Sequence, residues 1–215
     1  MTSPSRPAIL QVQALNFAYA GAPALVRAWS ATLRAGVTLL HGDTGSGKST
    51  LLRLLAGVLP AKGRLTLAGV RLDEDAAAYR RQVFFCDPAT DRFDQHTARD
   101  TTALLGAGDP RFNEDRWQGA VDGFALTPHL DKPMYMLSTG SKRKVWLAAA
   151  LGSGRALILL DEPTGGLDAA SIKCLWSALT RCAERSDQAV VVATAERIER
   201  IDHTPLAGSI ELPLA

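Results

Sequence analysis

A glycine-rich segment holds the residues whose types and spacing are most informative about chemistry. Residues 42–49 match the pattern G-x-x-x-x-G-K-[ST] at every fixed position. The apolar run 37–40 precedes this segment and the apolar run 51–56 follows it. We therefore expect a strand, a loop and a helix in succession, which is the context that a phosphate-binding loop requires. The flanking pattern disfavours the alternative, a glycine-rich turn that matches by chance.

The chemistry of such a loop follows from its backbone. Glycines let the chain turn tightly, so that successive N–H groups point at phosphate oxygens, and the helix N-terminus adds a partial positive charge. Lys48 is expected to reach the β- and γ-phosphates of a nucleoside triphosphate, and the Ser49 hydroxyl to ligate Mg²⁺. The other expected nucleotide contacts in this segment are Gly42, Asp43, Thr44, Gly45, Ser46, Gly47 and Thr50.

Two carboxylates follow a second apolar run. Residues 156–160 are continuously apolar and are followed directly by Asp161 and Glu162. A phosphate loop needs a carboxylate at the end of a neighbouring buried strand to order the Mg²⁺ shell, and Asp161 is placed for that role. Glu162 is then the candidate base for an attacking water. The alternative is a strand that merely ends in acidic residues, and the phosphate loop upstream disfavours it.

Composition limits the class of protein. The chain has 215 residues, 47% of them hydrophobic and 21% charged, which indicates one ordinary globular domain. A net charge of +2 predicts no nucleic-acid partner. We find no apolar run long enough to span a bilayer and no signal-peptide core in the first residues, so we expect a cytoplasmic protein with at most a peripheral membrane role. Cys86, Cys174 and Cys182 form no C-x-x-C pair and are expected to be free thiols.

The remaining pattern predicts alternating strands and helices, an α/β fold. Residues 1–7 are expected to be frayed, and 9–19 to form an edge strand. Segment 88–136 lacks strand signals, and the spacing of Trp117, Val121 and Phe124 predicts one apolar helical face; we interpret it as a helical subdomain inserted into a single domain, 1–215. Further strands are expected at 25–33, 64–69, 83–86, 156–160, 189–193 and 209–212, and helices at 51–56, 142–151 and from 169.

Three further segments resemble one protein family. Residues 137–141, Leu-Ser-Thr-Gly-Ser, resemble the LSGGQ signature of ATP-binding cassette (ABC) ATPases, and lie between the phosphate loop and the acidic strand as in that family. Residues 161–164 and 165–168 resemble its Walker B motif and D-loop. Tyr19 lies where the family stacks an aromatic ring on adenine. The resemblance covers Ile9 to about Glu196, and small single-cassette transport ATPases, including the haem-export ATPases of cytochrome c maturation, have similar lengths.

The resemblance implies a fold, an activity and partners. It implies a P-loop NTPase fold with a mostly parallel central sheet, an antiparallel β edge and an inserted helical subdomain. Two cassettes, identical or different, would pack head to tail around two ATP molecules. Ser138 and Gly140 of one would then contact the γ-phosphate held by the other. A transmembrane permease subunit would bind the helical subdomain, which places the protein at the cytoplasmic face of the membrane.

The sequence departs from the family at two positions. Where the family carries a Gln that helps to hold Mg²⁺, this chain has Asp87, which either contacts a metal-bound water or is a turn residue before a proline. Where the family carries a His that contacts the γ-phosphate, this chain has Ala195. Neither His203 nor His41 is expected to replace it. Loss of one such polar group commonly costs on the order of 10²–10³ in rate, so slow hydrolysis is expected.

Three functions remain open, in this order. The first is the energy-coupling ATPase subunit of an ABC transporter. The second is a regulatory or assembly module that binds ATP and scarcely turns it over, which the missing Gln and His favour. The third is a soluble cassette of DNA repair or translation, which is disfavoured because such proteins usually carry coiled-coil, zinc or tandem-cassette elements that this sequence lacks.

Overall fold

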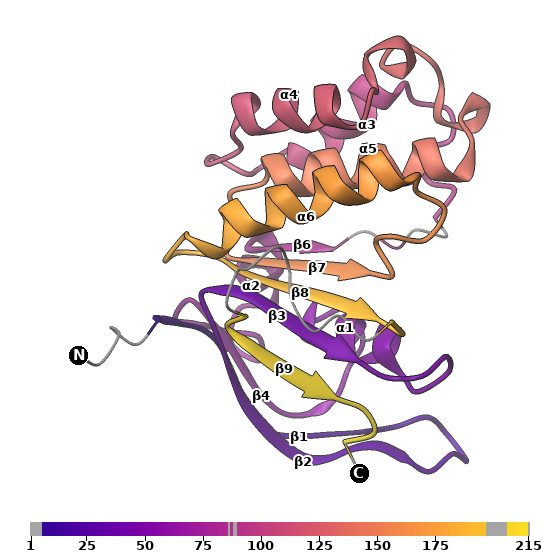
Figure 1. Cartoon of the computed structure of the whole chain (residues 1–215). Helices are drawn as coiled ribbons and strands as arrows, with labels where there is room; N and C mark the ends of the chain where they lie inside the picture. Colours follow the sequence, from indigo (N-terminus) through magenta and orange to yellow (C-terminus); the bar gives the residue numbers. More distant parts are fainter. Residues whose placement is uncertain (1–5, 86, 88–89, 197–205, 215) are drawn as a thin grey trace.

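The computed structural model describes residues 6–85, 87, 90–196 and 206–214. It contains two sheets with helices packed around them (Figure 1). The predicted α/β architecture is confirmed, with a parallel central sheet and a separate antiparallel sheet. The predictions about residues 1–5, Cys86 and His203 lie outside the described residues. Residues 1–7 are expected to fray, but Pro7 is held in place, because its carbonyl accepts a hydrogen bond from Ala35 N at 2.9 Å.

The central sheet has strand order β6-β7-β8-β3-β9, and all of its pairs are parallel. β8 is buried along its whole length and β3 up to its last residue, which explains their predominantly apolar sequences. Because the strands run parallel, the carboxyl ends of β3, β7 and β8 meet at one edge of the sheet. The strands span Gly36–His41 (β3), Val83–Phe85 (β6), Leu157–Asp161 (β7), Ala189–Thr194 (β8) and Gly208–Glu211 (β9).

The antiparallel sheet has the order β2-β1-β4-β5, and it corrects one prediction. The first strand is not an edge strand, because β2 pairs with it on one side and β4 on the other. Its alternation is only partial because the register shifts near Ala14, which adopts a φ of +47°. The strands span Ala8–Ala18 (β1), Ala24–Arg34 (β2), Lys62–Leu67 (β4) and Val70–Arg71 (β5).

The helices lie on both faces of the central sheet (Figure 1). Two of them, α1 (Lys48–Leu55) and α2 (Ala76–Arg81), follow β3 and β5. The sequence reading missed α2, which is short and buries only Tyr79. The elements described between β6 and β7 are helical: α3 (Ala98–Gly106), α4 (Glu114–Gly123), the 3₁₀ turns η1 (Thr127–His129) and η2 (Met134–Met136), and α5 (Thr139–Gly152). Helix α6 (Ala169–Ala183) separates α4 from the sheet.

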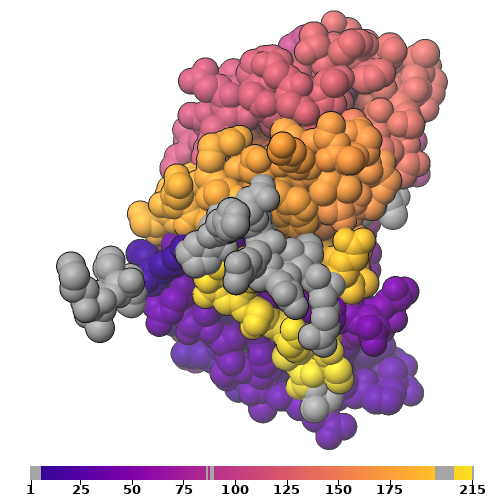
Figure 2. Space-filling model, viewed as in Figure 1, coloured from indigo at the N-terminus to yellow at the C-terminus, as the bar shows by residue number. Residues whose placement is uncertain are grey.

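Two hydrophobic cores hold these layers together. One packs α3–α6 against one face of the central sheet and contains Trp117, Val121 and Phe124. Trp117 and Val121 belong to α4, whereas Phe124 follows its last residue, so the predicted helical face is confirmed for the first two residues only. The other packs α1 and the antiparallel sheet against the opposite face. In the space-filling view the helices between β6 and β7 form one end of the molecule, and β9 lies against the N-terminal strands at the other (Figure 2). Among the described residues, no helix has both the length and the apolar character needed to cross a membrane.

Candidate functional site

The glycine-rich loop connects β3 to α1, as the sequence predicts. Its backbone turns at Gly45 and Gly47, whose φ angles of +80° and +100° are unfavourable for residues with a Cβ. Gly47 is also the N-cap residue that precedes α1, and a Cβ there would collide with Leu25. A Cβ on Gly42 would lie 2.5 Å from Ser46 Oγ. The loop geometry therefore depends on glycine at these positions.

Lys48 is the buried cation of this loop. Its side chain is only 7% exposed. Its Nζ donates hydrogen bonds to Gly42 O at 2.7 Å and Asp43 O at 3.1 Å, and it lies 3.2 Å from Glu162 Oε1. The structure therefore brings the predicted phosphate-binding lysine into an ion pair with the predicted base, although 114 residues separate them in the sequence.

A cavity of about 540 Å³ is lined by residues at the carboxyl ends of three strands, and most of them are predicted site residues. The loop after β3, the acidic pair at the end of β7 and the residues after β8 all line it, which is the usual ligand position in an open parallel sheet. Its lining consists of Thr44, Gly45, Gly47, Lys48, Ser49, Thr50, Asp161, Glu162, Ala195 and Glu196.

Asp161 has the surroundings of a metal-binding carboxylate. Burial raises its pKa, the hydrogen bond from Ser49 opposes that shift, and the negative charge of Glu162 adds to it. Its Oδ1 is buried and accepts no hydrogen bond among the described residues. Among all the residues that the structure describes, no group of three or more His, Cys, Asp or Glu side chains could hold an ion. A Ser hydroxyl with one carboxylate suits Mg²⁺, which keeps several waters and phosphate oxygens in its shell.

Glu162 adopts a strained backbone conformation. Its φ of +43° is in the left-handed region, which costs a residue with a Cβ about 1–3 kcal/mol. Hydrogen bonds on both sides hold it, because its N–H donates to Ala193 O at 2.9 Å and its carbonyl accepts from Arg143 Nη1, also at 2.9 Å. In this conformation Glu162 lines the cavity together with Asp161.

Asp87 has two interpretations, a turn residue and a contact of the metal site, and its observed contacts agree with both. Its carbonyl accepts a hydrogen bond from Thr90 N at 3.1 Å, as in a turn. Its carboxylate accepts one from Arg53 Nη2 of α1 at 2.6 Å. Asp87 also adds to the rise in the pKa of Asp161, so its negative charge acts on the predicted metal site. Sequence reasoning missed Arg53.

Tyr19 lies beside the loop but makes a contact that was not predicted. Its hydroxyl is 3.1 Å from Thr50 Oγ1, and its ring packs edge-on against Phe17. The residue is 49% exposed. Tyr19 is thus half-exposed beside the phosphate loop.

The signature-like segment is placed away from this cavity. Ser138 is the N-cap residue that precedes α5, and its Oγ accepts a hydrogen bond from Ser141 N at 3.1 Å. Neither Ser138 nor Gly140 is among the described residues that line the cavity.

The position after β8 lines the cavity without contributing a polar side chain. Ala195 stands there, and the next residue, Glu196, brings an exposed carboxylate that the sequence reading did not consider. His41 cannot compensate, because it is the last residue of β3 and its Nδ1 lies 2.9 Å from Glu211 Oε2 of β9.

Three consecutive basic residues lie at the start of α5, and their contacts are the main ones that sequence reasoning missed. Lys142 pairs with Asp94 at 2.6 Å and Lys144 with Asp168 at 2.7 Å, while Arg143 binds backbone carbonyls. The Lys144 ammonium, with the N–H and hydroxyl of Ser171, holds the pKa of Asp168 well below its usual range. The sequence did carry a signal, because positive charge at a helix N-terminus is unfavourable unless acceptors compensate it.

Comparison with known proteins agrees with this geometry. A family profile described as ABC transporter matches residues 26–165. The cytochrome c biogenesis ATP-binding export protein CcmA of Rhodospirillum rubrum is 38% identical over 177 residues, which is 80% of this chain and 73% of that protein. ATP-binding cassette sub-family A member 17 of Mus musculus is 30% identical over 162 residues, 74% of this chain but only 9% of the relative's length.

A solved structure extends the comparison to the fold. It is the dimeric structure of a post-hydrolysis state of an ATP-binding cassette bound to ADP and Pi. It matches with a TM-score of 0.70 over 87% of this chain and 88% of its own, at 19% identity, which supports a shared fold.

Proposed function

Because the chain belongs to the ABC transporter family of ATP-binding cassettes, we propose that it is a transporter subunit that binds ATP and hydrolyses it slowly. The observation that carries the proposal is the cavity shared by the phosphate loop and the acidic pair. Lys48, Ser49, Asp161 and Glu162 all line it, and these are the groups that phosphoryl transfer to water requires.

Each group then has a role in the proposed reaction. The loop N–H groups and Lys48 bind the phosphates. Ser49 and Asp161 would hold Mg²⁺, and the bound ion would supply positive charge next to the phosphate oxygens. When the Lys48 ammonium turns to a phosphate oxygen, the Glu162 carboxylate loses its partner at 3.2 Å and becomes able to accept a proton from the attacking water. The Asp87 carboxylate, which accepts a hydrogen bond from Arg53 at 2.6 Å, would bind a water in the shell of that ion.

A second cassette completes the site in this proposal. Ser138 and Gly140 lie outside their own molecule's cavity, and the start of α5 directs N–H groups and a positive dipole end outward. The fold neighbour bound to ADP and Pi is itself a dimer. Two copies of this chain, or this chain and another cassette, would pack head to tail, with each signature segment on the nucleotide of the other.

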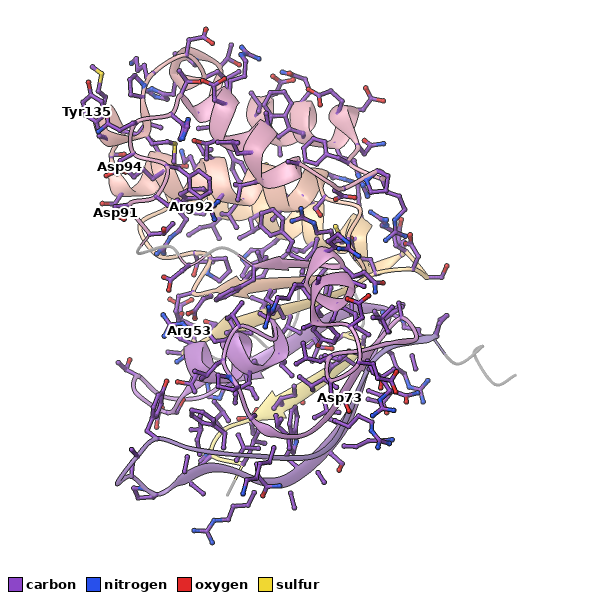
Figure 3. The ribbon with its side chains drawn as sticks, turned by 180° about the vertical axis from the view of Figure 1, so that it is seen from behind. Arg53, Asp73, Asp91, Arg92, Asp94 and Tyr135 are labelled. Carbon is purple, nitrogen blue, oxygen red and sulfur yellow. The ribbon has the colours of Figure 1, made fainter. Side chains whose placement is uncertain are left out.

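The surface for the membrane partner is proposed on the segment between β6 and α5. Tyr135 and Met136 are 57% and 61% exposed, which is unusual for large apolar side chains. Tyr135 lies beside Asp94, and its N–H donates to the Asp94 carbonyl at 3.0 Å. Figure 3 shows Asp91, Arg92, Asp94 and Tyr135 together at one end of the helical layer, on the side of the molecule where Arg53 lies. A permease bound there would hold the cassette at the cytoplasmic membrane face.

One observation favours a second candidate function. Ala195 offers no hydrogen bond to the γ-phosphate, so the chain could serve as a regulatory or assembly module that binds ATP and dimerises with little turnover. The retained Glu162 in the cavity argues against it, because a scaffold has no need of a base.

Phosphate release by the purified protein and by the Glu162→Gln variant separates the two candidates. ATP binding, measured in parallel, shows that both proteins are loaded. We expect a measurable wild-type rate below roughly 1 s⁻¹ that the substitution abolishes. Equal inactivity of the two proteins, with dimerisation still driven by ATP, would favour the module. A wild-type rate above that limit would contradict slow hydrolysis.

A further inference from the structure

The start of α5 is electrostatically unusual. Lys142, Arg143 and Lys144 occupy its first turns, where the helix dipole disfavours positive charge. Lys142 and Lys144 are compensated by carboxylates, those of Asp94 and Asp168. Arg143 differs from both neighbours, because the acceptors of its hydrogen bonds are backbone carbonyls.

The two carbonyls that Arg143 binds belong to one tight turn. Its Nη1 donates to Glu162 O at 2.9 Å and to Gly165 O at 2.5 Å. The same Glu162 carbonyl accepts the N–H of Gly165 at 3.2 Å, which closes the turn. A single guanidinium nitrogen thus connects Glu162 and Gly165 within residues 162–166, a segment called turn 162–166 that begins at the proposed base.

This turn also lies directly against the signature-like segment. A Cβ on Gly140 would lie 2.5 Å from the Gly166 carbonyl, so only glycine permits the approach. Glu162 holds a left-handed φ of +43°, and such a conformation persists only where the surroundings impose it. Arg143 supplies one of those restraints from α5, the helix that Ser138 caps.

We propose that Arg143 is a positioning residue that fixes the Glu162 carboxylate by clamping turn 162–166 to the first turns of α5. The inference rests on the proposed function, since it assumes that Glu162 is the base. The inference also adds a regulatory link. Ser138 and Gly140 would contact the nucleotide of the partner cassette, and the effect of that contact would reach this molecule's own Glu162 through Arg143.

The test compares Arg143→Ala with Lys142→Ala. Both substitutions remove one positive charge from the same helix start, but only Arg143 contacts the turn. We expect Arg143→Ala to lower kcat by about 10²-fold, the effect of displacing a catalytic group by about 1 Å, with ATP affinity unchanged. Millimolar ethylguanidinium should restore part of the rate. Lys142→Ala should lower kcat less than about fivefold, because it loses only a partly exposed ion pair.

Three results would overturn the proposal. They are an equal kcat for the two variants, a parallel loss of ATP affinity in Arg143→Ala, and no rescue by ethylguanidinium. Hydrogen exchange of residues 160–170, measured without nucleotide, separates this proposal from the proposed function. If wild type and Glu162→Gln release phosphate equally, the catalytic assignment fails. Even in that case, faster hydrogen exchange of residues 160–170 in Arg143→Ala than in Lys142→Ala supports the hold of Arg143 on the turn. Equal exchange in the two variants overturns it.

Discussion

The substitution Ala195→His tests most directly why hydrolysis should be slow. Ala195 lines the cavity with Lys48 and Glu162. The cavity volume of about 540 Å³ leaves room for an imidazole. The new side chain would place a hydrogen-bond donor at the edge of this cavity, where the wild-type protein has only a methyl group.

The expected gain can be worked from one hydrogen bond. A hydrogen bond to a charged group contributes about 1.5–3 kcal/mol. At 1.36 kcal/mol for each tenfold change in rate, a bond made only in the transition state raises kcat about 10- to 150-fold. We expect the lower part of this range, because Ala195 is only half-buried and the Glu196 carboxylate competes for the imidazole.

Phosphate release at saturating ATP and Mg²⁺ is the assay. Ala195→Leu is the matched control, since it adds comparable bulk without a polar atom, and its rate should not rise. The gain should also vanish in the Ala195→His, Glu162→Gln double variant, because histidine assists the base and does not replace it. An unchanged rate with normal ATP binding, or an equal gain in Ala195→Leu, would refute the reasoning.

Three further predictions concern stability and are measured by urea unfolding. Tyr79→Phe should lower the free energy of unfolding by about 1–3 kcal/mol, because it leaves the buried Leu55 carbonyl without the hydroxyl that donates to it at 2.8 Å; an unchanged midpoint would contradict this. Ala68→Asn should raise it by about 0.5 kcal/mol, because Ala68 has a φ of +45° before Gly69, a turn geometry that asparagine favours; a decrease would show that the turn does not set the energy. Burial raises the pKa of the Cys182 thiol to about 11. The unfolded thiol ionises near pH 8.5, so the stability gained by burying the protonated thiol is complete below that pH and is lost as pH rises toward 11. The free energy of unfolding should therefore fall more in wild type than in Cys182→Ala over that range, and equal falls would refute the assignment.

Local pattern was sufficient for most elements of the fold. The strands before the phosphate loop and before Asp161 are continuous apolar runs, and the structure has them as β3 and β7. Prediction failed where pairing partners decide the outcome. The partial alternation of residues 9–19 suggested an edge strand, whereas β1 is paired on both sides and its irregularity comes from a bulge. Helix α2 was missed because its six residues bury one side chain.

The sequence by itself determined the chemistry of the chain. Motif spacing identified a phosphate loop, an acidic pair and a signature-like segment, because the residue types in these motifs are set by local backbone geometry and ligand chemistry. Only the tertiary structure decided which groups meet. The Lys48–Glu162 ion pair, the Asp87–Arg53 pair and the hold of Arg143 on turn 162–166 each join segments that are far apart in the chain. Such contacts depend on how strands order in a sheet and how helices cover it, and no local pattern encodes that arrangement.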